Sequence, residues 1–128
     1  MIISPVQTIA SVDKGTRVDE RQISELLPGT LYMMLLRTLS AGPMHGYAIA
    51  KHIRTWSKGN LRIEDGSLYP ALNRMLVKGW LTSVWGTSEN NRRARFYRLT
   101  REGRKQLDQQ SNAFTRMVQA IQMVMRRS

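Results

Sequence analysis

The sequence predicts a mainly α-helical fold with one small β-hairpin, in which a small head precedes a single long C-terminal helix. Three observations support this prediction. Between residues 26 and 79, apolar residues recur with the period of an α-helix in three segments joined by short links. Two runs rich in aromatic and β-branched residues, 80–85 and 95–99, then flank a turn-forming segment. Residues 102–128 carry an apolar stripe with heptad spacing.

Composition restricts the class of partner. The chain has 128 residues, with 20 Lys and Arg against 9 Asp and Glu, and a formal net charge of +11. Such a charge favours nucleic acid or an acidic membrane surface as a partner. The absence of cysteine excludes disulfides, thiolate zinc sites and thiol nucleophiles. No apolar run reaches the roughly 18 residues of a membrane span and no signal-peptide pattern begins the chain, so we expect a cytoplasmic protein without a membrane partner.

Residues 1–25 are predicted to form an N-terminal arm that is flexible or a short helix, because they show no sustained period. They hold three basic residues and four acids, a net charge of −1, which leaves +12 for residues 26–128. An arm that enters a DNA minor groove would be basic, so we do not expect that role. We interpret the arm as a tether, a short helix added to a dimer, or a dispensable leader.

The first two helices of the head are predicted at 26–39 and 45–56, separated by the helix-breaking segment 40–43. Apolar residues surround most of the first helix, which indicates burial on several sides. Its methionines belong to the core in this interpretation, although a subunit interface or an adaptable ligand pocket is an alternative. The second helix is expected to bury Ile49, Ile53 and Trp56, with Gly46 close enough to this face to allow contact with another backbone.

Two histidines on the second helix are candidates for a metal site. His45 and His52 are seven residues apart and could share one side of the helix. Two turns separate them by roughly 10 Å along the helix axis, which is too far to share an ion readily. No third ligand clusters nearby in the sequence, so we expect no metal site and interpret both as surface or packing residues.

The third helix has an apolar inner face and a small, polar outer face. Because Pro70 is expected to fit only in a first turn, we expect the helix to begin near Ser67, with Asp65 or Ser67 as its cap, and to stop at Gly79. The inner face holds Leu68, Leu72, Met75 and Leu76, and the outer face holds Ser67, Pro70, Asn73 and Arg74, with Tyr69 at its edge. This outer face suits a helix that reads a DNA groove, although an ordinary solvated face is the alternative.

The hairpin that follows is rich in arginine. Between residues 90 and 105 there are seven basic residues and one acid, Glu102. Arg92 and Arg93 lie in the expected turn, from which they could reach phosphates or a narrow minor groove. A solvated basic surface is the alternative interpretation.

The last helix is predicted to begin with Thr100 as its cap and to reach about Met125. Its apolar and small positions are spaced four, three, four, three and four residues apart, and they are Leu107, Ser111, Phe114, Val118, Ile121 and Met125, with Met117 and Val124 beside them. A heptad stripe of this length predicts contact with a second subunit, although packing onto the same head is an alternative. A symmetric dimer would pair two reading helices on a palindromic site, with half-sites one turn, roughly 34 Å, or a multiple of it apart.

Five blocks of sequence, in order, resemble the signature of the PadR-type transcriptional regulators. They are Leu27-Pro28-Gly29-Thr30-Leu31, Leu39 to Tyr47, Glu64 to Arg74, Lys78-Gly79-Trp80-Leu81, and Asn91 to Gly103. The resemblance covers about residues 26–107. It implies a winged helix-turn-helix domain at 26–101 and a C-terminal dimerisation helix at 102–128, as in the short members of the family.

The resemblance also implies the site residues. Carried over by position, the DNA contacts are Ser67, Tyr69, Pro70, Asn73 and Arg74 on the third helix, and Arg92, Arg93, Arg95 and Tyr97 on the hairpin. The expected dimer interface is Leu107, Phe114, Met117, Val118, Ile121 and Met125. Family members with phenolic or hydrophobic effectors bind them near this interface. The tail here has no tryptophan to stack on a planar effector, so the effector and its existence stay open, and no cofactor is expected.

The function predicted from these features is a sequence-specific DNA-binding transcriptional regulator, a repressor that binds as a homodimer. An RNA-binding or non-specific nucleic-acid-binding module is the alternative, and it would usually expose aromatic side chains for stacking on unpaired bases. An enzyme is not expected, because the sequence has no cysteine, no Ser/His/Asp spacing and no glycine-rich phosphate loop.

Overall fold

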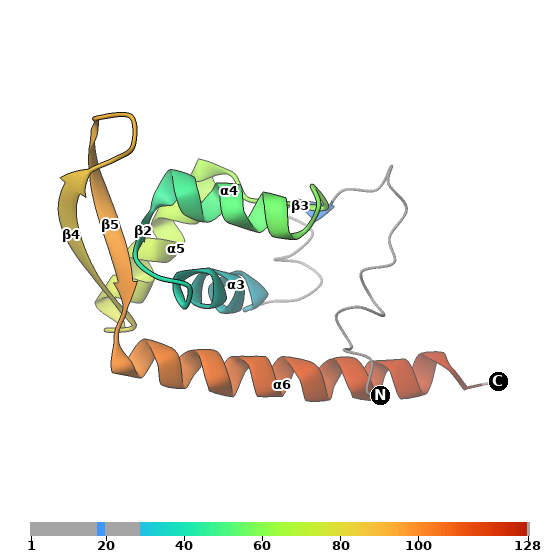
Figure 1. Cartoon of the computed structure of the whole chain (residues 1–128). Coiled ribbons are helices and arrows are strands. Elements are labelled where there is room, and N and C mark those ends of the chain that lie inside the picture. The colour runs from blue at the N-terminus through green and yellow to red at the C-terminus, as the bar shows by residue number, and fades with distance from the viewer. Residues whose placement is uncertain (1–17, 20–28, 128) are drawn as a thin grey trace.

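Helices form most of the part of the chain that the computed structural model describes, residues 18–19 and 29–127 (Figure 1). The helices are α3 (Thr30–Leu39), α4 (Gly46–Trp56), α5 (Asp65–Val77) and α6 (Arg101–Met125). The strands are β1 (Val18–Asp19), β2 (Met44–His45), β3 (Leu61–Arg62), β4 (Leu81–Thr87) and β5 (Arg93–Leu99). The predicted fold class, mainly α with a small hairpin, is confirmed. None of the described helices is both long and apolar enough to cross a membrane.

The core of the head forms around α3, which lies between α4 and α6 (Figure 1). Leu35, Leu36 and Leu39 of this helix are buried against apolar residues of α4, α5 and the hairpin. The hydroxyl of Thr38, also buried, donates to the carbonyl of Met34 at 2.8 Å, so its burial leaves no free donor. Burial on several sides is what the apolar circumference predicts.

Helix α4 begins one residue later than expected, because His45 caps it. The Nδ1 atom of His45 accepts from the backbone N–H of Ala48 at 3.3 Å. Ile49 and Ile53 are buried as predicted, but the prediction for Trp56 is wrong, since 52% of this residue is exposed. Trp56 is the last residue of the helix, and its ring packs edge-on against His52 of the same helix instead of the core.

Helix α5 begins at Asp65, two residues before the predicted start, so Pro70 is its sixth residue. The carbonyl of Glu64 accepts from the N–H groups of Ser67 and Leu68 at 3.0 and 2.9 Å, which starts the helix early. The missing N–H of Pro70 removes one helical hydrogen bond, to the carbonyl four residues before it. Glu64 occupies the cap position without a side-chain bond, so the predicted caps are wrong, and Asp65 instead places its charge in the positive first turn.

The hairpin of β4 and β5 is antiparallel, as predicted, with Leu81 opposite Leu99 and Thr87 opposite Arg93. Its turn closes with a bond from the N–H of Ser88 to the carbonyl of Arg92, at 2.8 Å. A third strand, β2, pairs antiparallel with β5 and was not predicted. Two residues are too few to show a period, so this strand has no sequence signal. It ties the start of α4 directly to the hairpin.

Helix α6 is joined to the head by a compact set of hydrogen bonds around Thr100. The Thr100 hydroxyl accepts from the N–H of Gly103 at 3.0 Å, which confirms the predicted cap. The same hydroxyl lies 2.7 and 3.0 Å from the carbonyl oxygens of Gly79 and Trp80, and the Thr100 N–H donates to Trp80. Gly103 packs so closely on the Trp80 carbonyl that an added Cβ would overlap it. From this joint α6 runs past the head (Figure 1).

Of the predicted N-terminal arm, residues 1–25, the structure describes Val18–Asp19 alone. These two residues form β1, which pairs in parallel with β3. The other residues of the arm lie outside the described part of the chain, and so does the prediction that they are flexible or helical.

Candidate nucleic-acid interface

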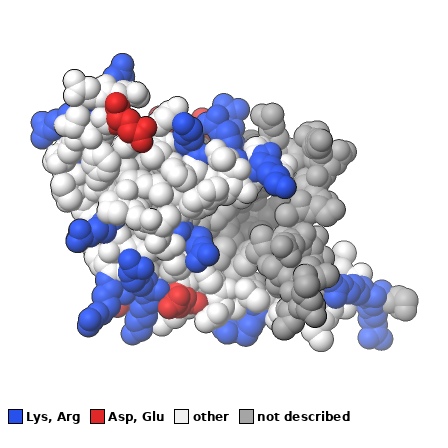
Figure 2. All heavy atoms as spheres, viewed as in Figure 1, with Lys and Arg blue, Asp and Glu red and all other residues white. Residues whose placement is uncertain are grey.

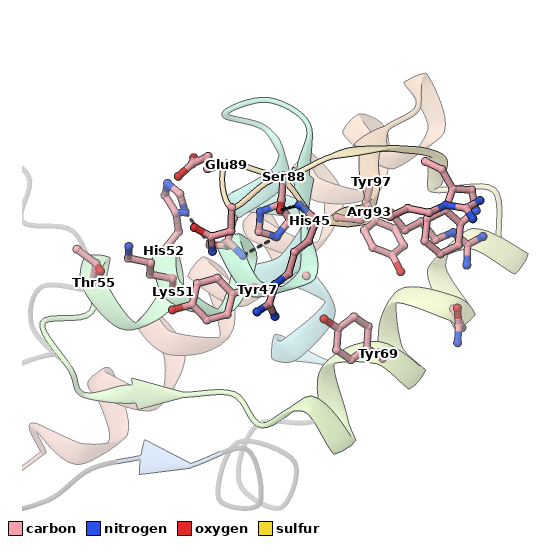
Figure 3. Close-up of a pocket in the computed structure, with 18 of the residues that line it drawn as sticks. His45, Tyr47, Lys51, His52, Thr55, Tyr69, Ser88, Glu89, Arg93 and Tyr97 are labelled. Carbon is pink, nitrogen blue, oxygen red and sulfur yellow. Dashed lines mark hydrogen bonds between the residues drawn. The ribbon is translucent and has the colours of Figure 1, made fainter.

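An open groove of about 1290 Å³ lies between α4, α5 and the hairpin (Figure 3). Helix α4 forms one wall with its first two turns and its outer face, and the hairpin turn forms the opposite wall. Tyr69 and Asn73 of α5 also line it. The groove therefore brings the hairpin together with α4 and α5, through the pairing of β2 with β5 and the packing of α5 on the same core.

The walls of this groove are basic. The lining holds four permanent cations and one acid, Glu89, and the cations are Lys51, Arg92, Arg93 and Arg95. Figure 2 shows basic side chains in separate groups over one face of the molecule, including the end of the hairpin. A groove with excess positive charge attracts the phosphates of nucleic acid and raises the rate of encounter.

The predicted reading face of α5 is divided by its neighbours. Tyr69 and Asn73 are exposed and line the groove. Pro70 is also exposed and Ser67 is half-buried, but neither lines the groove. Arg74 turns away from it, because its Nε atom donates to the hydroxyl of Tyr32 on α3 and its guanidinium lies over that ring.

Tyr69 is held by a contact that the sequence did not predict. A Cβ atom built on Gly46 would stand 2.6 Å from two atoms of the Tyr69 side chain, including its hydroxyl oxygen. Gly46 therefore permits close approach, but of this side chain and not of a backbone as we expected. Burial, with smaller contributions from Asp65 and Tyr97, raises the pKa of the Tyr69 hydroxyl, so the group is neutral and able to donate at physiological pH.

The hairpin arginines differ in exposure and in their contacts with the protein. Arg92 and Arg93 are exposed, and Arg93 lies over the ring of Trp85 with its guanidinium carbon 4.5 Å from the ring centroid. The Nε atom of Arg95 donates to the Ser83 hydroxyl across the hairpin at 2.8 Å, which fixes this side chain against the groove wall. Tyr97 belongs to the core and is only 3% exposed, so its hydroxyl end is the part available to the groove.

Sequence reasoning missed the contribution of α4. Tyr47, Lys51 and Thr55 are exposed, lie one turn apart from each other and line the groove. Their spacing of four residues on the face opposite Ile49 and Ile53 is the signal that would have found them. The exposed rings of Trp56 and Trp85 also line it and were not predicted.

Comparison with known proteins identifies the family. Residues 35–109, more than half of the chain, match the family model described as the transcriptional regulator PadR-like family. The chain belongs to this family. Its members are transcriptional regulators that bind DNA, not enzymes, so this PadR-like protein is a DNA-binding regulator with a winged helix-turn-helix head.

Solved structures agree with this assignment. A transcriptional regulator from Clostridium thermocellum is similar to the PadR-like chain at 29% identity and a TM-score of 0.71, over 78% of this chain and 97% of that one. A PadR family transcriptional regulator from Eggerthella lenta has 27% identity and a TM-score of 0.71, over 85% and 93% of the two chains. Among curated sequences, uncharacterized protein X of Lysinibacillus sphaericus is 22% identical over 102 residues, 80% of this chain and 94% of its own.

The heptad stripe of the PadR-like chain is exposed to different degrees along α6. Leu107 is buried in the core of its own head, the alternative left open for this stripe, and Val118 is buried outside that core. Phe114 is half-buried. The remaining predicted interface residues present apolar surface to solvent in the single chain, and they are Met117, Ile121 and Met125.

Both histidines of α4 have structural contacts in the PadR-like chain. His45 caps the helix, and the Nδ1 atom of His52 lies 2.7 Å from the carbonyl oxygen of Ala48. No group of three His, Cys, Asp or Glu within 18–19 and 29–127 is arranged to hold a metal ion.

Proposed function

We propose that this PadR-like regulator is a homodimeric repressor that binds a palindromic operator through α5 and the arginine-rich hairpin. The observation that carries the proposal is the basic groove, in which side chains of α5 and the hairpin face the same open space. Asn73 would contact a base edge in the major groove, and Tyr69, exposed on the same helix, would also contact the duplex. Lys51, Arg92 and Arg93 would bind phosphates and set the orientation of the head on the duplex.

Binding to a pool of genomic duplex fragments tests this proposal. The purified protein should select fragments that share an inverted repeat, and its mass in solution should be that of two chains. A single-stranded RNA competitor should displace the selected duplex poorly. Equal retention of all duplexes, or better binding to the RNA than to the duplex, would favour a non-specific or RNA-binding module instead.

Changing Arg92 and Arg93 together to alanine should weaken binding to every duplex and flatten its salt dependence. Each lost phosphate contact should reduce the slope of log affinity against log salt by about 0.9. Titrations at several salt concentrations, on operator and random DNA, measure this. Arg126→Ala with Arg127→Ala is the matched control, because it removes the same charge from exposed positions at the far end of α6. An identical slope for wild type and the hairpin variant would remove the hairpin from the interface.

Asn73→Ala should reduce discrimination more than overall affinity. An amide that contacts a base edge contributes on the order of 1–3 kcal/mol of preference for the correct base. The measurement is the ratio of affinities for operator and random duplex in each protein. Losses of the same size on both duplexes would show that Asn73 does not read bases.

A small hydrophobic or aromatic effector would release the repressor from its operator by binding near the dimer interface. The support for this part of the proposal is the apolar surface of Phe114, Met117 and Ile121 on one side of α6. A panel of planar aromatic compounds can be screened for release of labelled operator, with Phe114→Ala as the test of location. A compound that releases the operator equally well from both proteins would bind elsewhere.

A further inference from the structure

The hydroxyl of Tyr97 has no hydrogen-bond partner among the described residues. Only 3% of Tyr97 is exposed, and the Arg95 guanidinium lies over its ring. The rest of the residue is buried, and the hydroxyl lies at the lining of the groove, where it can bond to a bound group. Phenylalanine would fill the same volume in the core without this hydroxyl.

This hydroxyl faces a second one in the groove. Figure 3 shows the hydroxyl end of Tyr97 pointing toward Tyr69, and the influence of Tyr97 on the pKa of Tyr69 reflects the same proximity. Neither hydroxyl bonds to the other in the described structure. Both line the open groove, and Tyr69 is 40% exposed, so a ligand in the groove can reach this pair.

The first turn of α4 lies beside the Tyr97 and Tyr69 side chains. Tyr97 is opposite Met44 in the sheet, two residues before the first residue of α4, and the Tyr69 hydroxyl lies against Gly46, that first residue. The first N–H groups of an α-helix have no partners within the helix and carry the positive end of its dipole. His45 satisfies the N–H of Ala48, the third residue of this eleven-residue helix.

We propose that Tyr97, Tyr69 and the first turn of α4 form a seat for one oxyanion, a phosphodiester group of the bound duplex. Two hydroxyl donors and a helix N-terminus complement an anionic oxygen better than a base edge, which presents both donors and acceptors. Lys51, one turn further along α4, and Arg95 on the hairpin add positive charge to the same groove. Gly46 leaves the space that the Tyr69 side chain occupies. This inference rests on the proposed DNA binding and assigns a new ligand group to that site.

Tyr97→Phe tests the seat by removing a single oxygen atom. The variant should keep its thermal stability and should lose about tenfold in affinity per head, or about 100-fold for the dimer, on operator and random duplex alike, as for one hydrogen bond to a charged group in each head. Thr82→Val is the control, since it also removes one hydroxyl oxygen, at an exposed position of β4 outside the groove, and it should change random-duplex affinity by less than twofold.

Each other outcome overturns the seat in a recognisable way. Unchanged affinity with Tyr97→Phe would remove the seat while leaving DNA binding intact. A loss confined to the operator would assign the hydroxyl to a base instead of a phosphate. A fall in stability would show that the hydroxyl has a structural partner. If the wild-type protein binds no duplex, the proposed function fails before the seat is tested.

Gly46→Ala tests whether the seat depends on the position of Tyr69. The new methyl group would overlap the Tyr69 ring, so the variant should lose about tenfold in affinity per head, or about 100-fold for the dimer, on all duplexes. In a Tyr69→Ala background the same change should cost less than twofold, because the obstructing ring is absent. Equal losses in both backgrounds would show that Gly46 does not act through Tyr69, and the seat as proposed would be wrong.

Discussion

Replacing Met117 and Ile121 together with glutamate should dissociate the regulator and reduce its operator affinity by on the order of 100-fold or more. The two residues are 60% and 45% exposed in the single chain, so the change should leave the head intact. In the proposed dimer, the same positions would bury four carboxylates without partners, which costs several kcal/mol for each ion. A single head would then hold one half-site, without the gain that a second linked contact provides.

The mass in solution and the operator affinity of this variant check the prediction. Asn112→Glu with Gln119→Glu is the control, because it adds the same charge at exposed positions on the opposite face of α6. The control should stay dimeric and keep most of its operator affinity. A small loss is expected because the added glutamates weaken the attraction between the protein and DNA. If both variants stay dimeric, or if both lose affinity equally, the exposed stripe of α6 is not the subunit interface.

Gly103→Ala should destabilise the fold by about 3 kcal/mol or more, which places it among the strongly destabilising single substitutions. The added methyl group would overlap the carbonyl oxygen of Trp80, a backbone atom held by hydrogen bonds from Thr100. Because the Trp80 carbonyl and Thr100 hold each other in place, the strain can be relieved only by moving the start of α6 away from the head. That movement would also pull Leu107 from the core.

Thermal or denaturant unfolding measures this effect, with an expected fall in Tm on the order of 10 °C. Gly66→Ala is the matched control, because Gly66 also lies in the first turn of a helix and an added Cβ there meets nothing within 4 Å. Alanine favours the helix by up to about 1 kcal/mol over glycine, so the control should be neutral or slightly stabilised. A Gly103→Ala protein as stable as this control would show that the joint between α6 and the head is loose.

The joint has a functional consequence for the proposed dimer. Thr100 and Gly103 attach α6 rigidly to the head, and Leu107 extends this attachment into the core. The direction in which α6 leaves the head therefore follows from backbone contacts. If two such helices pair, this direction sets the separation of the two α5 helices and so the spacing of the operator half-sites.

The predictions that held for the fold rest on local signals. The period of apolar residues located α4 and α5, the β-branched and aromatic runs located the hairpin, and a threonine before a helix-forming segment identified Thr100 as a cap. The early start of α5 follows from local bonds to the Glu64 carbonyl, whereas two other misses depended on neighbours distant in the sequence. Trp56 follows the helical period but lies at the end of α4 where no core covers it, and the two-residue strand β2 exists only because β5 lies beside it.

The candidate site divides in the same way. Motif resemblance and charge predicted Tyr69, Asn73, Arg92 and Arg93, and the structure places these residues around one groove. The outer face of α4 was missed, because its four-residue spacing marks an exposed face but does not show that this face lies toward the hairpin. Arg74 was included on its helical position, yet its guanidinium is bound to Tyr32 on α3, a pairing that separation by 42 residues conceals.

By itself, the sequence determined the fold class, the order of the helices and the hairpin, the excess of positive charge and the family, because each depends on residue type and short-range spacing. Only the tertiary structure decided which side chains share the groove, that Tyr97 is buried with its hydroxyl toward that groove, and how closely Gly46 and Gly103 meet their neighbours. The reason is that contacts between distant residues follow from packing of the whole core. A hydrophobic period records that a face is buried, but not what covers it.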